Sequence, residues 1–429
     1  MKVEHPEKPS AEWSYGDPDY WDEASLEREL RRVGDICHQC RRCLPLCPSF
    51  PKLFDLVDAT DDEIQGVSRE GFDAVNELCF HCKLCYNHCP YHPPHDWDVD
   101  FPALMRRQQL VRNKRDGVPL MRKLTTRTDL LGALGSAAPP LMNFANRNRL
   151  SRIGMEKTVG IHRDWVQPTY HAETVDKWFR KRGGPRGSGE NGQAVLFTTC
   201  SVNFNDPETG RAAVEVMERS GIRVDVAYPG CCGMPSTDTG DLDAMRRAAS
   251  RNVEALWPHV DAGAKVVVPG PSCSLLMKTE YPKLLESDAA RRVAEATVDL
   301  MEFLFQLGKA KLLNREFVNP LGRVAYHAPC HLRAQNVGFP TRALLKVAGA
   351  EVELVDACSG VDGTWGMQAR FHDASLQVAS KMVERIREAR PDEIATDCPL
   401  SGLRIEETLG RKPVHPVVLL RRAYGEAET

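Results

Sequence analysis

Two runs of closely spaced cysteines near the amino end are the residues best suited to redox chemistry in this 429-residue chain. The first run reads Cys37-x2-Cys40-x2-Cys43-x3-Cys47-Pro48, and the second repeats it as Cys79-x2-Cys82-x2-Cys85-x3-Cys89-Pro90. This spacing is typical of proteins that hold a pair of [4Fe–4S] clusters. Three thiolates two residues apart bind three corners of one cube, and the fourth, before the proline, binds the other cube.

The spacing therefore predicts two clusters with crossed ligands. One is expected on Cys37, Cys40, Cys43 and Cys89, and the other on Cys79, Cys82, Cys85 and Cys47. A structural zinc site or a set of disulfides is the alternative for such cysteines. Zinc, however, needs only four ligands, usually arranged as two separated pairs. Two identical runs favour iron–sulfur clusters.

The composition excludes several classes of function. A hydrophobic content of 42% and a charged content of 27% describe an ordinary globular protein, and the net charge of −3 gives no case for nucleic-acid binding. No stretch approaches the roughly 18 apolar residues of a membrane span. The start, MKVEHPEKPS, has no apolar core, so we expect no signal peptide. Fifteen cysteines without an export signal predict metal ligation in a reducing compartment, which favours the cytoplasm.

The elements that must position the two runs are predicted to be helical. Residues 1–33 form a polar extension, within which residues 21–32 predict a short charged helix. Residues 34–100 form a ferredoxin-like domain. The 31 residues between Cys47 and Cys79 are too many for a small, mostly β ferredoxin, and residues 61–78 carry apolar side chains at helical spacing.

Three histidines lie at the end of the second run and just beyond it, at positions 88, 92 and 95. A third metal site is one interpretation of them. Packing or contact with a partner is favoured, because Pro93 and Pro94 hold this segment extended.

Residues 101–192 are predicted to form a helical connector that ends in a flexible glycine-rich linker at 181–193. Its basic residues suit an acidic partner or an anionic membrane surface, although solvated charge is the commoner explanation. Residues 128–144 are apolar but are interrupted by Pro139 and Pro140. That segment is compatible with a membrane-surface role and too short for a span.

From residue 193 onward the chain repeats one pattern, in which a short strand runs into a cysteine. In the first pass, strands at 194–197, 223–228 and 265–268 lead to Cys200, to Cys231-Cys232-Gly233 and to Cys273. In the second pass, strands at 323–326, 351–355 and 393–396 lead to Cys330, to Cys358-Ser359-Gly360 and to Cys398.

Intervening helical stretches predict a parallel sheet in each half, with domains at 193–318 and 319–429. The loops after parallel strands meet at one sheet edge, so three cysteine loops converge in each half. Burial of single cysteines as small apolar residues does not explain this repetition.

These residues resemble the iron–sulfur C subunit of anaerobic glycerol-3-phosphate dehydrogenase over nearly the whole chain. They also resemble fused B and C subunits of heterodisulfide reductase and the iron–sulfur subunits of glycolate and lactate oxidases. The matching stretches are the two cysteine runs, TDLLG at 128–132, CSVN at 200–203, CCG at 231–233, YHAPCH at 326–331, GTWG at 363–366 and TDC at 396–398. The resemblance implies an α+β multidomain protein: a helical two-cluster ferredoxin-like domain followed by two tandem α/β CCG (cysteine-rich) domains with parallel sheets.

In the families that the chain resembles, each CCG domain can hold a cluster through the pattern C…CCG…CxxC. Carried over by position, the first site has Cys200, Cys231, Cys232 and Cys273, with Gly270 in place of a fifth cysteine. Four thiolates suffice for an ordinary [4Fe–4S] cluster.

The second CCG site departs further from the pattern. Ser359 and Ser401 replace two cysteines, which leaves Cys330, Cys358 and Cys398. His331 or His327 could complete a Cys3His zinc site. A cluster with an open iron and a set of metal-free thiols remain as alternatives.

Nothing in the sequence indicates a flavin or nicotinamide site, since Gly184 to Gly189 matches neither phosphate-binding pattern. Electrons must therefore pass to or from a separate protein or a quinone. The first hypothesis is an electron-transfer subunit of an oxidoreductase, cytoplasmic or peripheral on the inner face of the membrane, with a flavoprotein dehydrogenase as donor and a membrane quinone as acceptor. The second is a disulfide or persulfide reductase that acts at the first CCG site. The third is a docking scaffold in which metal stabilises the CCG half.

Overall fold

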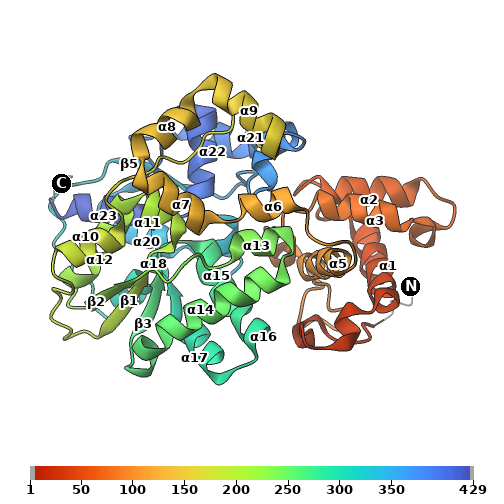
Figure 1. The fold of residues 1–429 in the computed structure, drawn as a ribbon, viewed down its shortest axis with the longest axis horizontal. Coiled ribbons are helices and arrows are strands. Elements are labelled where there is room, and N and C mark those ends of the chain that lie inside the picture. The colour runs from red at the N-terminus through yellow and green to blue at the C-terminus, as the bar shows by residue number, and fades with distance from the viewer. Residues whose placement is uncertain (1–4, 426–429) are drawn as a thin grey trace. The chain divides into compact units, whose positions relative to one another are not determined.

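The computed structural model describes residues 5–425 of the chain (Figure 1). These residues form two compact units. The first runs to Lys123 and includes Ser236–Leu242, and the second comprises Leu124–Pro235 together with the chain from Asp243 onward. Helices α6 (Leu120–Thr125), α13 (Met234–Thr239) and α14 (Leu242–Asp261) contain the three boundaries. Within residues 5–425, the helices are all too short or too polar to cross a bilayer.

The first unit is built from helices around an apolar core. Its elements are η1 (Ser10–Glu12), η2 (Pro18–Trp21), α1 (Glu23–Cys40), α2 (Ser49–Asp58), η3 (Glu63–Gly66), α3 (Arg69–Glu77), α4 (Leu84–His88) and α5 (Phe101–Asp116). The core takes one face from each of the longer helices, including Val33, Phe50, Val75 and Leu104. Six of the cysteines in the two runs pack against this core: Cys37, Cys43, Cys47, Cys79, Cys85 and Cys89.

The helices of the first unit differ from the sequence-based expectation in two places. Helix α1 continues past residue 32 to Cys40, where Arg41 takes the left-handed conformation (φ 48°) and turns the chain. The helical pattern over 61–78 is divided into η3 and α3. The division falls at Ser68, whose side chain accepts a hydrogen bond from the Gly71 N–H and caps α3.

The second unit contains two parallel sheets, as the strand–helix–strand pattern predicts. One has the order β2-β1-β3-β4 and the other β6-β5-β7. The strands are β1 (Gln193–Phe197), β2 (Arg223–Ala227), β3 (Lys265–Val268), β4 (Thr297–Asp299), β5 (Arg323–His327), β6 (Glu351–Val355) and β7 (Glu393–Thr396). The central strands β1 and β5 pair with equivalent neighbours, so the two sheets are copies of one arrangement. Strand β4 was not expected, because its three residues lie between two helical patterns.

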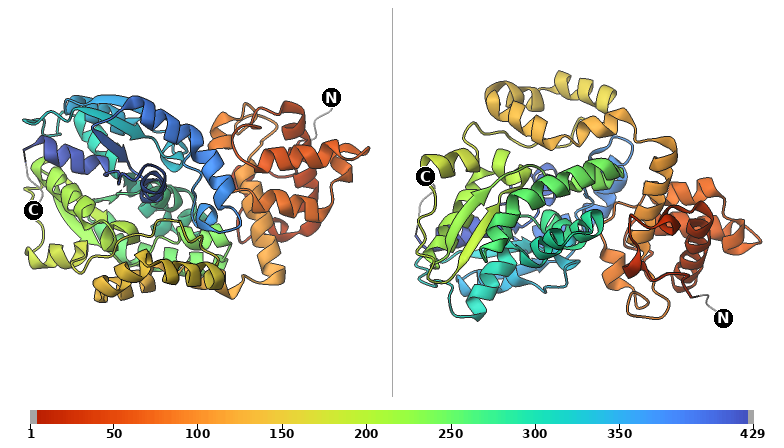
Figure 2. Two further views of the ribbon diagram at one scale, coloured as in Figure 1. Left: turned by 90° about the horizontal axis from the view of Figure 1, so that it is seen from above. Right: turned by 60° about the horizontal axis from the view of Figure 1, so that its bottom comes forward.

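Helices flank both sheets of the second unit (Figure 2). They are α7 (Thr128–Ala137), α8 (Pro139–Arg147), α9 (Arg149–Val159), α10 (Val175–Lys181), α11 (Thr199–Phe204), α12 (Pro207–Arg219), α14 (Leu242–Asp261), α15 (Pro271–Thr279), α16 (Tyr281–Leu285), α17 (Asp288–Ala296), α18 (Leu300–Lys309), α19 (Cys330–Arg333), α20 (Pro340–Val347), η4 (Trp365–Met367), α21 (His372–Ala389), α22 (Pro399–Leu409) and α23 (Pro416–Ala423).

One apolar core serves both repeats. It includes Leu196 from the first sheet, Val324 from the second, and Val417 from the last helix. Helix α12 packs on α23, and α18 packs on α20. The glycine-rich segment predicted as a flexible linker is held against this core, since the Arg186 N–H donates to Glu218 and the Asn191 amide donates to the Ser220 carbonyl. The cysteine loops of both repeats are therefore supported by one shared apolar core.

Candidate functional site

The fifteen cysteines all lie in the described part of the chain and are free thiols. In the first unit they sit where helices end or begin. Cys37 and Cys40 occupy the last turn of α1, and Cys85 lies in the short helix α4. His81 and Lys83, which flank Cys82, have positive φ angles of 52° and 60°, so the second run wraps tightly instead of continuing as helix.

The thiols of the two runs influence one another electrostatically. Burial raises the pKa of Cys37 well above its usual value, and the next largest causes are Cys43, Cys89 and Cys40. Burial also raises the pKa of Cys85, followed by the influence of Cys79 and Cys47. Cys43 and Cys37 of the first run also raise the pKa of Cys85, so the eight thiols lie near one another, and their division between two clusters stays a prediction. Such gathered thiols have a high proton affinity when empty, and a metal must displace those protons to bind.

The three histidines at the end of the second run and just beyond it do not share a site. His88 meets the Arg42 guanidinium at 3.3 Å, His92 lies 2.6 Å from the Pro93 carbonyl, and His95 accepts a hydrogen bond from the Trp97 N–H at 3.0 Å. Each imidazole ring contacts a different group, which agrees with a packing role.

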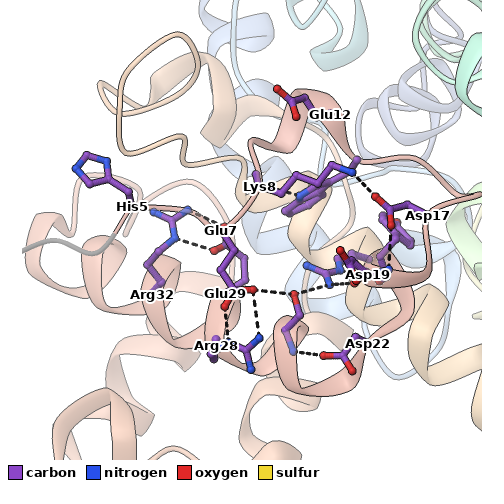
Figure 3. A pocket seen from close by; sticks show the side chains of 14 residues that line it. His5, Glu7, Lys8, Glu12, Asp17, Asp19, Asp22, Arg28, Glu29 and Arg32 are labelled. Atoms are coloured by element: carbon purple, nitrogen blue, oxygen red, sulfur yellow. Dashed lines mark hydrogen bonds and ion pairs between the residues drawn. The ribbon is translucent and has the colours of Figure 1, made fainter.

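The first unit also has a polar cavity of about 410 Å³ between the amino-terminal segment and α1 (Figure 3). Several of its charged groups form ion pairs. Arg28 pairs with Glu7 at 2.6 Å, Arg32 pairs with Glu29 at 2.6 Å, and Lys8 pairs with Asp17. The buried Arg107 guanidinium donates to the Tyr20 carbonyl at 2.8 Å. The Arg28–Glu7 pair and the Arg107–Tyr20 hydrogen bond fasten the amino-terminal segment to helices α1 and α5.

The first CCG site gathers four thiols from three loops. Cys200 lies in the first turn of α11 after β1, Cys231 and Cys232 follow β2, and Cys273 lies in the first turn of α15 after β3. The Cys232 and Cys273 sulfur atoms are 3.0 Å apart, and Cys200 is hydrogen-bonded to Cys231. That bond raises the pKa of Cys200 and lowers the pKa of Cys231. Four converging thiols match the ligand number of a four-iron cluster.

Helix α7 contributes two polar side chains to this site. The Thr128 hydroxyl lies beside the Cys200 and Cys231 thiols and lowers their pKa values, but within residues 5–425 it makes no well-formed hydrogen bond. The Asp129 carboxylate accepts the Cys231 N–H at 2.7 Å and the hydroxyl of Tyr228. The sequence analysis placed the TDLLG stretch in a resemblance and in a segment compatible with a membrane surface, and it assigned Thr128 and Asp129 no role at a metal site. The structure makes it the polar cover of the first CCG site.

Buried amide and phenol groups hold the backbone of the CCG loop. The Asn252 amide donates to the Cys231 carbonyl at 3.0 Å, and the Tyr281 hydroxyl donates to the Cys232 carbonyl at 2.8 Å. Asn252 also donates to the Tyr281 oxygen at 2.8 Å. Sequence reasoning missed both residues, because single polar positions within helices carry no spacing signal.

The second CCG site brings together the three thiols predicted for it. Cys330 opens α19, Cys358 follows β6, and Cys398 precedes α22. Burial raises the pKa of Cys330, and the charges of Asp362, Cys358 and Cys398 raise it further. Burial also raises the pKa of Cys358 to about 11.

The structure distinguishes the two histidines considered for this second site. Both nitrogens of His327 are engaged, Nδ1 with the Thr396 hydroxyl at 3.1 Å and Nε2 with the Ala357 carbonyl at 3.0 Å. The ring of His331 instead lies beside Cys330 and Asp362. Asp362 was not predicted. Its only sequence signal is its place in the loop that begins at Cys358.

The cysteine-rich domain profile of the CCG family matches residues 194–278 and 324–405, which correspond to the two sheets and their loops. The chain is 27% identical to the C subunit of anaerobic glycerol-3-phosphate dehydrogenase from Escherichia coli strain K12 over 301 residues, 69% of this chain and 75% of the relative. It is 26% identical to the glycolate oxidase iron-sulfur subunit of the same strain over 385 residues, 84% and 86% of the two chains. It is 33% identical to lactate utilization protein A of Geobacillus kaustophilus over 215 residues, 47% of this chain and 86% of the relative.

Proposed function

The chain belongs to the CCG family of cysteine-rich iron–sulfur oxidoreductase proteins, and on this premise we propose that it relays single electrons between a flavoprotein partner and an acceptor such as a quinone. The proposed carriers are two [4Fe–4S] clusters in the first unit and a further [4Fe–4S] cluster in the first CCG site. When bound, such a cluster takes up or gives up one electron at a time.

The proximity of the thiols of the two runs in the first unit is the observation that carries this proposal. Cys89 approaches the triplet of Cys37, and Cys47 approaches the triplet of Cys85. A pair of clusters that shares its binding loops in this way is held close together, as electron transfer between them requires. Arg42 and Lys83 lie within the two runs, and nearby positive charge favours the reduced state of a cluster.

The first CCG site supports the proposal through its surroundings. Thr128 places a hydroxyl beside two thiols, and Asn252 and Tyr281 fix the loop that carries Cys231 and Cys232. Hydrogen bonds to sulfur and a rigid backbone set the potential of a cluster and limit reorganisation when its charge changes.

A peripheral contact with an anionic membrane surface is part of the proposal, because it would bring the chain to a membrane quinone. Helices α7, α8 and α9 lie at the periphery of the second unit (Figures 1 and 2). They expose large apolar side chains, which are Leu130, Leu131, Leu134, Leu141, Phe144 and Leu150. Arg127, Arg147 and Arg149 accompany these apolar residues in sequence. Exposed apolar groups together with cations are typical of helices that lie on anionic lipid.

Iron counting and oxidation kinetics test the electron relay. The full chain is reconstituted anaerobically, and the proposal predicts about twelve iron atoms per chain, whereas about eight would leave the first CCG site empty of cluster. The protein is then reduced with a photoreduced flavin and mixed with a water-soluble quinone or a small disulfide. Rapid oxidation by the quinone alone supports the relay. Preferential oxidation by the disulfide would support a reductase instead, and a colourless folded preparation would overturn both.

Vesicle flotation tests the membrane contact. The wild-type chain should float with vesicles that contain phosphatidylglycerol and remain behind with pure phosphatidylcholine. Phe144→Glu and Leu134→Glu should abolish flotation. Val318→Glu is the matched control, because Val318 is equally exposed but lies outside α7–α9. Equal flotation of all variants would exclude this surface.

A further inference from the structure

A group of metal-ligating atoms lies in the second CCG site. The Cys330 sulfur, a ring nitrogen of His331 and a carboxylate oxygen of Asp362 all lie within 4.8 Å of one another. The His331 and Asp362 side chains are buried, with 4% and 6% of their surfaces exposed. Thiolate, imidazole and carboxylate together form a ligand set that a single transition-metal ion prefers.

The ring of His331 is oriented as a metal ligand would be. Its Nδ1 lies 2.8 Å from the Ser272 hydroxyl, which fixes the ring. Its Nε2 faces the carboxylate and lies 3.1 Å from Oδ2 of Asp362. Metal-binding histidines characteristically hold one nitrogen by a hydrogen bond of this kind and use the other for the metal.

Asp362 supplies an independent sign of a cation. Its Oδ2 atom is fully buried and, although it lies near the His331 ring, accepts no well-formed hydrogen bond within residues 5–425. A buried carboxylate oxygen that accepts no well-formed hydrogen bond is unfavourable, and a bound cation would satisfy it.

The neighbouring groups disfavour a four-iron cluster and leave thiols that can complete the ligand set of a single ion. Ser359 and Ser401 stand where two thiols of the pattern would be, and their hydroxyls hydrogen-bond to each other at 3.0 Å. Cys358 and Cys398 remain, and both thiols lie within electrostatic reach of Cys330 and Asp362.

We propose that Cys330, Nε2 of His331 and Asp362, together with Cys358, bind one Zn²⁺ ion. Zn²⁺ takes four such ligands tetrahedrally and needs no redox partner. The ion would also fix the Ser272 hydroxyl through His331, next to Cys273 of the first CCG site. The second repeat would therefore stabilise the loop of the first repeat that carries Ser272 and Cys273. This site does not depend on the electron relay, since the ion itself carries no electron.

Metal analysis of the full chain tests the proposal. The protein is prepared anaerobically, loaded with zinc chloride and dialysed against a weak chelator. We expect about one zinc per chain in addition to iron. Asp362→Asn and His331→Gln should each lower the retained zinc at least tenfold, with the iron count unchanged. Asp356→Asn is the matched control, since that exposed carboxylate pairs with Arg385 at 2.8 Å, and it should retain zinc.

Two further measurements keep the test decisive if a variant folds poorly. X-ray absorption at the zinc edge of the wild-type chain should give two sulfur and two nitrogen or oxygen ligands. Ser272→Ala should weaken zinc binding by about 10- to 100-fold, which is the usual effect of removing a hydrogen bond to a ligating histidine. A wild-type chain without zinc, an Asp362→Asn chain with full zinc, or about four additional irons in this site would overturn the proposal. Loss of the relay with zinc retained would contradict only the proposed function.

Discussion

The Ser359 and Ser401 hydroxyls meet at 3.0 Å in the second CCG site, and the Cys232 and Cys273 sulfurs meet at the same distance in the equivalent place of the first. Both serines are buried, with 4% and 2% exposed. Two hydroxyls that bond to each other satisfy their polar groups without a metal. The two repeats thus share one backbone arrangement and differ in the chemistry at its centre.

Restoring the missing thiols should convert the second site to a cluster site. Ser359→Cys combined with Ser401→Cys gives five thiols at that edge of the sheet. We expect iron to rise by about four atoms per chain after reconstitution, because a four-iron cluster then has its full set of thiolates. Iron and zinc assays measure the exchange. The double substitution to alanine is the control and should gain no iron, and an unchanged iron count in the cysteine variant would contradict the equivalence of the two sites.

Cys232→Ser should remove the cluster of the first CCG site and leave both clusters of the first unit. The iron count is expected to fall from about twelve to about eight, with the loss of one spectroscopic component on reduction. Cys398→Ser serves as a control, since that thiol lies in the second site, and its iron count should not change. Unaltered iron and spectra in Cys232→Ser would show that this ligand assignment is wrong.

Thr128→Val should lower the reduction potential of the first CCG site. The buried hydroxyl of Thr128 lies beside the Cys200 and Cys231 thiols and makes no well-formed hydrogen bond within residues 5–425, so we expect it to donate to a cluster bound there. A hydrogen bond to sulfur stabilises the more negative, reduced state. A net contribution of about 1 kcal/mol corresponds to roughly 40 mV for one electron. Thr128→Ser keeps the hydroxyl and should keep the potential. A redox titration followed by electron paramagnetic resonance compares them, and equal potentials for the three proteins would argue against the contact.

Gly132→Ala should displace α7 from the first CCG site. A methyl group at this position would overlap the ring of Phe204, a residue of α11. We expect a loss of about 1–3 kcal/mol in the free energy of unfolding, as is typical of overpacking. At Gly154 in α9 a methyl group meets open space, so Gly154→Ala should stabilise the chain by about 0.5–1 kcal/mol. Urea denaturation followed by tryptophan fluorescence distinguishes the two, and equal midpoints would contradict the packing.

Asp299→Asn should flatten the dependence of stability on pH. Burial, followed by the charge of Asp397, raises the pKa of Asp299 from its ordinary 3.8 to about 8. Between these values the folded state holds more protons than the unfolded state, so the free energy of unfolding falls as pH rises, by at most about 1.4 kcal/mol per pH unit. Urea midpoints at pH 5.5, 6.5 and 7.5 should fall less in Asp299→Asn than in the wild-type chain. The exposed Asp288→Asn variant should follow the wild type, and parallel curves for all three would refute the assignment.

Much of the fold of the second unit could be predicted from the sequence. Strands β3, β6 and β7 lie at the predicted residues, and the sheets are parallel as expected. Short apolar runs separated by helical stretches carry this information locally. Strand β4 was missed, because three residues between two helices give no periodicity. The extension of α1 to Cys40 was missed because its last turn is polar.

The sequence by itself determined which thiols are available and, through their spacing, which chemistry they suit, because ligand type and loop length are local properties of the chain. The tertiary structure alone decided what surrounds them. It brought Thr128 to Cys200 and Cys231, engaged both nitrogens of His327, and placed Asp362 beside His331. These contacts join segments tens of residues apart, and they depend on how the helices and sheets pack together, which no local pattern encodes.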